Sequence, residues 1–335
     1  MASRQWLLWE KFVKIQSMNL SIRENVKMGP LTTFRIGGLA KYFFEAKNKK
    51  ELKKVICWAQ EQNIPYFVLG GGSNILVSDQ GFNGLLIKIP AKDIKIKKSQ
   101  RGLKIVKVEA GVLLSKLIAF SVKQGLSGLE YFVGIPGTVG GAIYGNAGWP
   151  RNQKSIGEFM VKATLLMPDG QIKERQVDWF EFAYRSSKLK KNYPKKIIIL
   201  SAEFKLKIKE QNEILQTQKE ILNIRKKGIP QGYSCGCVFK NVEIKKNYSP
   251  SFRLTNELPI AFIKKGTIPA GWLIDKCGLK GYKIGGAQIS KQHANFIINV
   301  NKAKAQDVQS LIEIARQQVK KMFDISLSLE IEYLI

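Results

Sequence analysis

The chain has 335 residues, long enough for two or three domains with buried cores. Its 44% hydrophobic and 24% charged residues are ordinary for a globular protein, but a formal net charge of +29 is strongly basic. One histidine, His293, and four cysteines without zinc-site spacing argue against a zinc enzyme, a Ser-His-Asp triad and a Cys-His dyad. The first apolar run spans only four residues before Glu10, too short for a signal peptide or a membrane span, and the few cysteines favour a cytoplasmic location.

Hydrophobic periodicity and turn residues predict alternating strands and helices after an N-terminal arm over residues 1–25. In the first part we expect strands at 40–46, 65–70, 84–89, 93–109, 160–167, 171–177 and 197–206, and helices at 48–63 (with Asn48 as N-cap), 110–125 and 179–184. A polar helix over 210–228 marks the expected domain boundary. Beyond it we expect a second α/β unit with a helix over 303–322 and a last strand over 327–335.

Two glycine-rich segments are the strongest functional signals. Residues 128–148 hold seven glycines and one proline in an apolar run without Lys, Arg or Asp, and residues 66–82 place three glycines, Ser73 and Asn74 between two apolar runs. Because glycine is costly to order, such density favours a backbone that approaches a phosphate group or a flat ring, although tight turns alone remain an alternative. Neither segment has Rossmann or P-loop spacing, so we expect a large cofactor held between two small subdomains.

The lysines give the chain its basic character but are scattered. Around residues 93–108 they alternate with isoleucine or valine, which is the period of a half-exposed strand. The basic balance therefore favours anionic small ligands over a clustered nucleic-acid surface.

Three residues in the C-terminal half are candidates for a catalytic role, and each also has a purely structural explanation. Cys237 follows a glycine and precedes an apolar strand, so it is either an acid presented to a cleft or a buried thiol. Arg185 lies between an aromatic residue and two serines, and Glu332 lies in the segment LEIE. The ordinary alternative for both is a solvated surface charge without a catalytic role. His293 fits a structural role better than a catalytic one.

Seven segments taken together carry a family resemblance. They occur in the order TTFRIGG, VLGGGSNILVSDQGF, GLEYFVGIPGTVGGAIYGNAG, FAYRSSKLK, GCVFKN, AGWLIDKCGLKGYKIGGAQISKQHANFIIN and LEIE, from about residue 26 to the end. In order and spacing the chain resembles the UDP-N-acetylenolpyruvoylglucosamine reductases of peptidoglycan precursor synthesis. The resemblance implies an α+β protein with a two-subdomain FAD-binding fold of the vanillyl-alcohol-oxidase type and an α/β substrate-binding domain.

The resemblance also implies an activity and a domain division. NADPH reduces FAD, and hydride then passes to the enolpyruvyl ether of UDP-N-acetylglucosamine, giving UDP-N-acetylmuramate. The expected domains are the arm 1–25, an FAD-binding domain 26–208 with subdomains 26–92 and 93–208, and a substrate-binding domain 209–335. We expect a cytoplasmic monomer that binds a nucleotide sugar, no nucleic acid and no metal.

The resemblance also implies site residues, which are found by matching the family's motifs to this sequence position by position. The family's proton-donating serine falls on Cys237, its Y-R-x-S arginine on Arg185, and its C-terminal glutamate on Glu332. The expected FAD-binding residues are Arg35, Gly70, Gly71, Gly72, Ser73, Asn74, Gly134, Ile135, Pro136, Gly137, Thr138, Gly141 and Ala142. The expected substrate-binding residues are Tyr184, Lys227, Asn241 and Asn295.

Two other functions were weighed. A flavin oxidase of the same superfamily often binds flavin covalently through His or Cys, but His293, Cys235, Cys237 and Cys277 all lie outside the expected flavin domain. A basic nucleic-acid-binding protein would leave both glycine segments unexplained. We therefore rank the reductase first.

Overall fold

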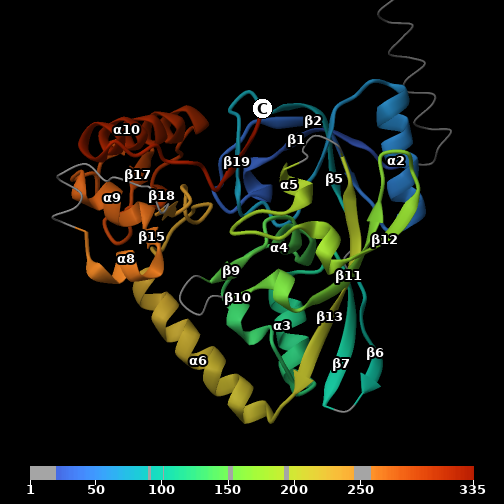
Figure 1. The fold of residues 1–335 in the computed structure, drawn as a ribbon. Helices are drawn as coiled ribbons and strands as arrows, with labels where there is room; N and C mark the ends of the chain where they lie inside the picture. The colour runs from blue at the N-terminus through green and yellow to red at the C-terminus, as the bar shows by residue number, and fades with distance from the viewer. Residues whose placement is uncertain (1–19, 90–91, 101, 150–153, 192–195, 245–257) are drawn as a thin grey trace, which may run out of the picture. The chain divides into compact units, whose positions relative to one another are not determined.

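The computed structural model describes residues 20–89, 92–100, 102–149, 154–191, 196–244 and 258–335. Residues 1–19 of the expected N-terminal arm (1–25) lie outside the described residues. The chain divides into two compact units (Figure 1). The first runs up to Val26 and continues with Ala40–Gly71 and Asn83–Asn223; the second comprises Lys27–Leu39, Gly72–Phe82 and Ile224–Ile335. The expected α+β class is confirmed, while the domain boundaries stay a prediction.

A four-stranded sheet forms one part of the first unit. Its order is β1 (Arg23–Lys27), β2 (Leu39–Glu45), β5 (Phe82–Lys88) and β3 (Tyr66–Val68), and β3 runs parallel to β5. Helix α2 (Lys49–Glu61) begins as predicted at Asn48, whose Oδ1 accepts a hydrogen bond of 2.9 Å from the Glu51 N–H. Its buried stripe of Leu52, Val55, Ile56 and Ala59 has helical spacing and joins the core of this sheet.

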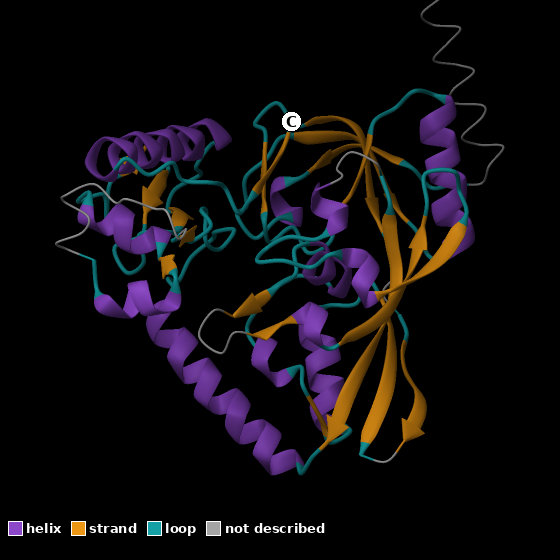
Figure 2. Cartoon of the chain, in the orientation of Figure 1, coloured by secondary structure: helices purple, strands orange, loops and turns teal. Residues whose placement is uncertain are grey.

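A larger antiparallel sheet forms the rest of the first unit (Figure 2). Its order is β12 (Ile172–Gln176), β11 (Met160–Leu166), β13 (Ile198–Ile208), β7 (Leu103–Glu109) and β6 (Ile94–Gln100), and β8 (Leu126–Ser127) also pairs with β13. Helices α3 (Leu114–Lys123) and α4 (Val139–Tyr144) share its core, in which Phe132, Phe180 and Phe204 are fully buried. The remaining elements are β9 (Gly148–Trp149), β10 (Lys154–Ser155), α5 (Lys188–Lys191) and α6 (Gln211–Gly228), whose last residues belong to the second unit.

Within its described residues, the second unit combines short strands with the end of α6 and the helices α8 (Ile260–Lys265), α9 (Ala270–Lys276) and α10 (Ala305–Phe323). Strands β16 (Lys283–Ile284), β17 (Ala287–Ile289) and β18 (Ile297–Asn299) form an antiparallel sheet, β14 (Val242–Glu243) pairs with β15 (Thr267–Ile268), and β19 (Glu332–Leu334) pairs with β4 (Ile75–Val77). Figure 1 shows α10 beside α9 and β17, where Val308, Leu311, Ile312, Ala315 and Val319 are buried.

Several elements differ from the sequence prediction. The strand expected over 93–109 is a hairpin of two strands, β6 and β7. The helix expected over 179–184 is wrong, because a 3-10 turn over Val177–Phe180 ends at Glu181 in a left-handed conformation, φ +46°. The last strand covers only Glu332–Leu334. Helix α4 lies inside the glycine-rich segment, where no helix was expected. No helix of the described ranges is both long and apolar enough to cross a membrane.

Candidate functional site

The two predicted glycine-rich segments meet within the first unit. A Cβ atom placed on Gly71 would lie 2.6 Å from the Gly137 Cα, and one placed on Gly70 would lie 2.7 Å from the Thr138 Oγ1. Both distances are shorter than van der Waals contact, so only glycine lets the two backbones approach this closely. The two glycine segments therefore pack directly against each other, and their role in holding a cofactor stays a prediction.

Backbone hydrogen bonds join the second glycine segment to residues 110–114, which lead into helix α3. The Gly137 carbonyl accepts from the Leu114 N–H (3.0 Å), and the Gly140 N–H donates to the Ala110 carbonyl (2.8 Å). Thr138 then caps α4, because its Oγ1 accepts from the Gly141 N–H at 3.2 Å. The cap and this backbone pairing stabilise a short helix whose glycines alone would disfavour it.

The exposure of these residues suits a cofactor phosphate. Gly134, Pro136 and Gly141 are exposed, whereas Thr138 and Ala142 are buried beneath the surface. The segment thus presents a strip of accessible backbone with few side chains. Because few side chains stand in the way, a pyrophosphate can come close to this backbone, so the residues present fit FAD. Of the other predicted residues, Gly70, Gly71, Ile135 and Gly137 are half-buried.

The remaining predicted FAD residues belong to the second unit. Gly72 has φ +61°, and a side chain there would collide with the Leu31 carbonyl. Asn74 Nδ2 donates to the Glu330 carbonyl at 3.0 Å, and its own carbonyl accepts from the Glu332 N–H at 3.0 Å. Arg35, at φ +58°, donates from Nη1 to the Pro30 carbonyl at 3.0 Å and lies 5.5 Å from the Tyr233 ring centre. Ser73 is half-buried.

Cys237 lies in a segment that is bonded on both sides within the second unit. On one side Cys237 pairs with Phe296, and the Val238 N–H donates to the Asn295 carbonyl at 2.8 Å. On the other side the Glu330 N–H donates to the Val238 carbonyl at 2.8 Å. Cys237 itself is only partly buried, so its thiol is fixed by its backbone yet accessible.

Cys235 differs from Cys237 in its surroundings. It is 2% exposed, and burial strongly raises the pKa of its thiol. A buried thiol held in the neutral form is a poor proton donor and a poor nucleophile. Of this pair, Cys237 is therefore the one suited to chemistry.

Glu332 begins β19 and is anchored near the end of the chain. It pairs in parallel with Ile75, and the Ser78 N–H donates to the Leu334 carbonyl at 2.9 Å. These bonds hold Glu332 in a sheet rather than in a fraying terminus. Because residue 330 is bonded to residue 238, Glu332 and Cys237 lie on neighbouring segments of one unit.

Arg185 belongs to the first unit and occupies a tight turn. Ala183 and Ser186 exchange two backbone hydrogen bonds of 3.1 Å, and Arg185 has φ +51°. Its Nη1 donates to the Gly148 carbonyl at 2.9 Å, and its guanidinium lies 5.7 Å from the ring centre of the exposed Tyr184. Arg185 is thus a positioned, half-buried side chain and not an ordinary surface arginine.

Asn146 supports this turn and was not found from the sequence. It is 5% exposed, donates from Nδ2 to the Ala183 carbonyl at 2.9 Å and accepts at Oδ1 from the Gly157 N–H at 3.2 Å. Ser187 adds a bond of 2.7 Å to the Tyr144 carbonyl. In the sequence its only signal is its place in the GNAG motif, between two glycines.

The predicted substrate-binding residues differ in their solvent exposure and in the hydrogen bonds that they already make. Lys227 is exposed in the last turn of α6, and Asn241 accepts at Oδ1 from the Ala270 N–H at 3.3 Å. Asn295 is 2% exposed. Their role toward a substrate stays a prediction.

His293 has a structural environment. Its Nδ1 accepts from the Asn295 N–H at 3.2 Å, and its ring centre lies 5.0 Å from that of Phe296. Burial lowers the pKa of His293, and the Lys280 charge contributes in the same direction. Over the part of the chain that the structure describes, no group of three His, Cys, Asp or Glu side chains is arranged to hold a metal ion.

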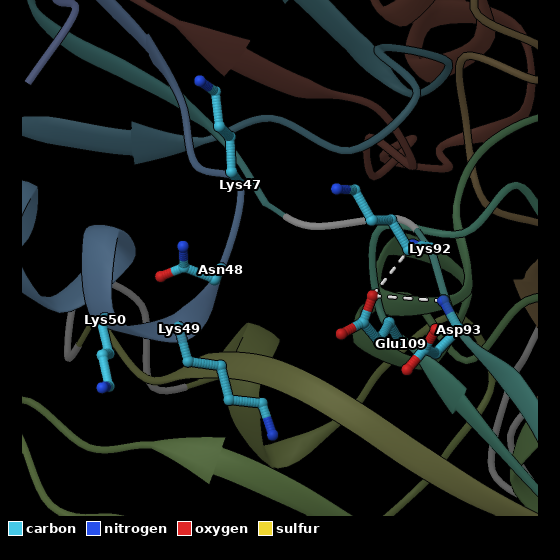
Figure 3. Close-up of a pocket in the computed structure, with 7 residues that line it drawn as sticks. All are labelled: Lys47, Asn48, Lys49, Lys50, Lys92, Asp93 and Glu109. Atoms are coloured by element: carbon cyan, nitrogen blue, oxygen red, sulfur yellow. Dashed lines mark hydrogen bonds between the residues drawn. The ribbon is translucent and has the colours of Figure 1, made fainter.

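A surface pocket of about 440 Å³ in the first unit contains none of the predicted site residues. The residues that line it (Figure 3) are Lys47, Asn48, Lys49, Lys50, Lys92, Asp93 and Glu109. Glu109 Oε2 accepts from the backbone N–H groups of Lys92 and Asp93, at 2.9 and 3.3 Å. The polar residues of this pocket other than the lysines therefore stabilise the local backbone or pair with neighbouring side chains. We place neither cofactor nor substrate in this pocket.

Comparison with known protein families shows to which class of protein this chain belongs. Residues 40–175, which include both glycine segments, match the family profile of the FAD binding domain. The chain is accordingly an FAD-binding flavoprotein. Residues 229–334 match a second profile, UDP-N-acetylenolpyruvoylglucosamine reductase, C-terminal domain.

Individual relatives cover almost the whole chain. The UDP-N-acetylenolpyruvoylglucosamine reductase of Anoxybacillus flavithermus is 37% identical over 315 residues, which are 93% of this chain and 94% of that protein. The reductase of Prochlorococcus marinus is 36% identical and covers 94% and 98%. The crystal structure of the reductase from Thermus caldophilus superimposes with a TM-score of 0.71 at 31% identity, covering 94% and 99%. The chain belongs to the UDP-N-acetylenolpyruvoylglucosamine reductase family.

Proposed function

We propose that this protein reduces the enolpyruvyl ether of UDP-N-acetylglucosamine to UDP-N-acetylmuramate, a step of peptidoglycan precursor synthesis, with NADPH as reductant. The observation that carries the proposal is the match to reductases of this name over 93% of the chain. The contact of the two glycine segments in the first unit supports the same conclusion.

The residues proposed to hold FAD are those of the two glycine segments, with Arg35. Bound FAD accepts hydride from NADPH and supplies it to the substrate. The accessible backbone around Gly134 and Gly141 suits the pyrophosphate, and Gly70 and Gly71 keep the first segment close to the second.

Arg185 is the proposed stabiliser of negative charge. Hydride addition to the methylene carbon moves the π electron pair toward the carbon that bears the carboxylate. A guanidinium stabilises that charge as it develops, and its planar fork suits a carboxylate. The Gly148 carbonyl holds one end of this guanidinium, which limits the orientations that it can adopt.

Cys237 is the proposed proton donor. Its thiol proton forms the second new C–H bond, at the carbon next to the carboxylate, and leaves a thiolate that regains a proton from water. A thiol is a stronger acid than the hydroxyl of the family's serine, so the replacement keeps the required chemistry. Glu332, on the neighbouring segment, is proposed to share a proton with the substrate carboxylate.

The remaining proposals concern the substrate-binding residues, the location and the partners of the protein. We propose that Tyr184, Lys227 and Asn241 contact the nucleotide sugar. We also propose a cytoplasmic location, since both the nucleotide-sugar substrate and NADPH are cytoplasmic metabolites. A monomer without a nucleic-acid partner stays part of the proposal.

Variants at Cys237 test the proposal by separating the two half-reactions. Cys237→Ala should leave flavin reduction by NADPH unchanged and slow flavin reoxidation by the enolpyruvyl sugar by roughly 10²- to 10⁴-fold, the usual contribution of a general acid. Cys237→Ser is the matched control and should retain most of the activity. Stopped-flow absorbance of the flavin measures both steps. Loss of both half-reactions in Cys237→Ala, or unchanged turnover, would contradict the assignment.

A further inference from the structure

The carboxamide of Asn295 is fully engaged with the backbone of one residue. Its Nδ2 donates to the Phe239 carbonyl at 2.8 Å, and its Oδ1 accepts from the Phe239 N–H at 2.9 Å. Asn295 is 2% exposed, so both bonds are shielded from water. A buried pair of this kind is costly to break, because each lost partner leaves an unsatisfied polar group.

The bonded residue, Phe239, lies next to the proposed proton donor in sequence. The backbone of Asn295 bonds to Val238, and Phe296 pairs with Cys237. Residues 237, 238 and 239 are thus held in succession by residues 295 and 296. This contact fixes the direction in which the chain leaves Cys237.

The chain enters Cys237 through a turn. Gly236 has φ +84°, a conformation that favours glycine. Residues 237–241, all described, form isolated bridges rather than a regular strand. The bonds that follow Cys237 therefore contribute to fixing the position of its backbone.

Asn295 is itself rigidly held. The Asn295 N–H donates to the His293 Nδ1, and the His293 N–H donates to the Ser290 Oγ at 3.2 Å. Ser290 is 1% exposed. Such a buried turn transmits its geometry to the residues that it binds.

We propose that Asn295 is a positioning residue that holds the Cys237 thiol in place for proton transfer, rather than a contact of the substrate. The inference rests on the proposed role of Cys237. A general acid must lie within hydrogen-bond reach of the carbon that it protonates, and a displacement of about 1 Å costs roughly 100-fold in rate.

The test is a double-mutant cycle on the FAD-loaded enzyme. Asn295→Ala should lower the rate of flavin reoxidation by the saturating enolpyruvyl sugar roughly 10- to 100-fold, with little change in KM and normal reduction by NADPH. In the Cys237→Ala background the same substitution should have almost no further effect. Site-resolved alkylation by iodoacetamide should show a changed rate at Cys237.

Two other variants keep the test informative. Asn295→Asp retains the acceptor for the Phe239 N–H but sets a carboxylate oxygen against the Phe239 carbonyl, so at neutral pH it should slow reoxidation at least as much as Asn295→Ala does. Asn299→Ala removes a comparable pair of bonds, from Nδ2 to the Phe34 carbonyl (3.1 Å) and from the Ala303 N–H to Oδ1 (2.9 Å). It should lower stability and leave the reoxidation rate close to that of the wild type.

The outcomes distinguish this inference from the proposed function. A raised KM with unchanged kcat would make Asn295 a substrate contact and overturn the inference. So would an equal loss in the Cys237→Ala background, or wild-type kcat in both Asn295 variants. If Cys237→Ala itself reoxidised at the normal rate, the proposed function of Cys237 would fail instead.

Discussion

Arg185 is held by a turn of unusual backbone conformation, and this makes its role testable. Arg185→Ala should slow reoxidation of the reduced flavin by the enolpyruvyl sugar by roughly 10²- to 10³-fold, the usual cost of removing a group that stabilises developing charge. Arg185→Lys keeps the charge but loses the planar fork, so it should recover only part of the rate. Reduction by NADPH is the internal control. Normal sugar turnover in Arg185→Ala would remove Arg185 from the mechanism.

His293 should make stability depend on pH. Burial lowers the pKa of His293 in the folded protein, so the unfolded chain binds a proton at a higher pH than the folded one. Its contribution to stability is therefore complete above the ordinary value of 6.5 and is lost as the pH falls below it. His293→Asn keeps an acceptor for the Asn295 N–H but does not titrate. Urea unfolding between pH 8 and pH 5 should be less pH-dependent in this variant; an unchanged slope would contradict the assignment.

The sequence offered candidate reactive residues but not the residues that support them. Motif order was enough to propose Cys237, Arg185 and Glu332, since it needs only residue identity and spacing, and their roles stay predictions. The bond from Asn74 to Glu330 joins residues 256 apart in the chain, and no local pattern reports such a contact. The same holds for Asn146, whose buried carboxamide bonds become visible only when the turn around Arg185 is folded.

At the scale of elements, the close packing of the two glycine segments predicts a specific sensitivity. Gly71→Ala would place a methyl group 2.6 Å from the Gly137 Cα, and backbone gives way less easily than a side chain. Overpacking of this kind costs roughly 1–3 kcal/mol, so both the melting temperature and the FAD content of the purified protein should fall.

Gly228→Ala is the matched control for that substitution. Gly228 is the last residue of α6, and a methyl group there would meet no atom of the described residues within 4 Å. Because alanine favours a helix more than glycine does, the variant should be as stable as the wild type or slightly more stable. Equal melting temperatures and FAD contents for Gly71→Ala and Gly228→Ala would show that the glycine contact is dispensable.

Regular elements with a continuous apolar stripe were the ones that could be predicted. Helix α2 and its Asn48 cap, and helix α10, follow from spacing that burial confirms. Helix α4 was missed because its glycines have low helix propensity, which the Thr138 cap and the pairing with Ala110 offset. The helix expected over 179–184 fails because Glu181 turns the chain out of helical geometry.

At the scale of the whole molecule, the division into compact units could not be predicted from the sequence. Segments Lys27–Leu39 and Gly72–Phe82 belong with the C-terminal residues, although both lie in the N-terminal third of the chain. Phe34, Ile36 and Leu76 enter that core, and β4 supplies the partner of β19. Composition and periodicity describe contiguous stretches, so they cannot show that a unit is assembled from distant ones.

The net charge of +29 is distributed over many exposed side chains. The alternation predicted around residues 93–108 is present, because Lys95 and Lys97 are exposed while Val106 and Val108 are buried. Lys95 pairs with Asp93 at 2.9 Å, and Lys97 pairs with Glu203 at 2.9 Å. Lys95 and Lys97 therefore lie on the solvated side of this sheet.

The measurement that tests the central claim most directly is the visible spectrum of the purified protein under anaerobic conditions. NADPH should bleach a bound flavin band, and the enolpyruvyl ether of UDP-N-acetylglucosamine, added without oxygen, should restore it with formation of UDP-N-acetylmuramate. Restoration by oxygen alone would indicate an oxidase. A protein that shows no flavin band even after reconstitution with FAD would contradict the account.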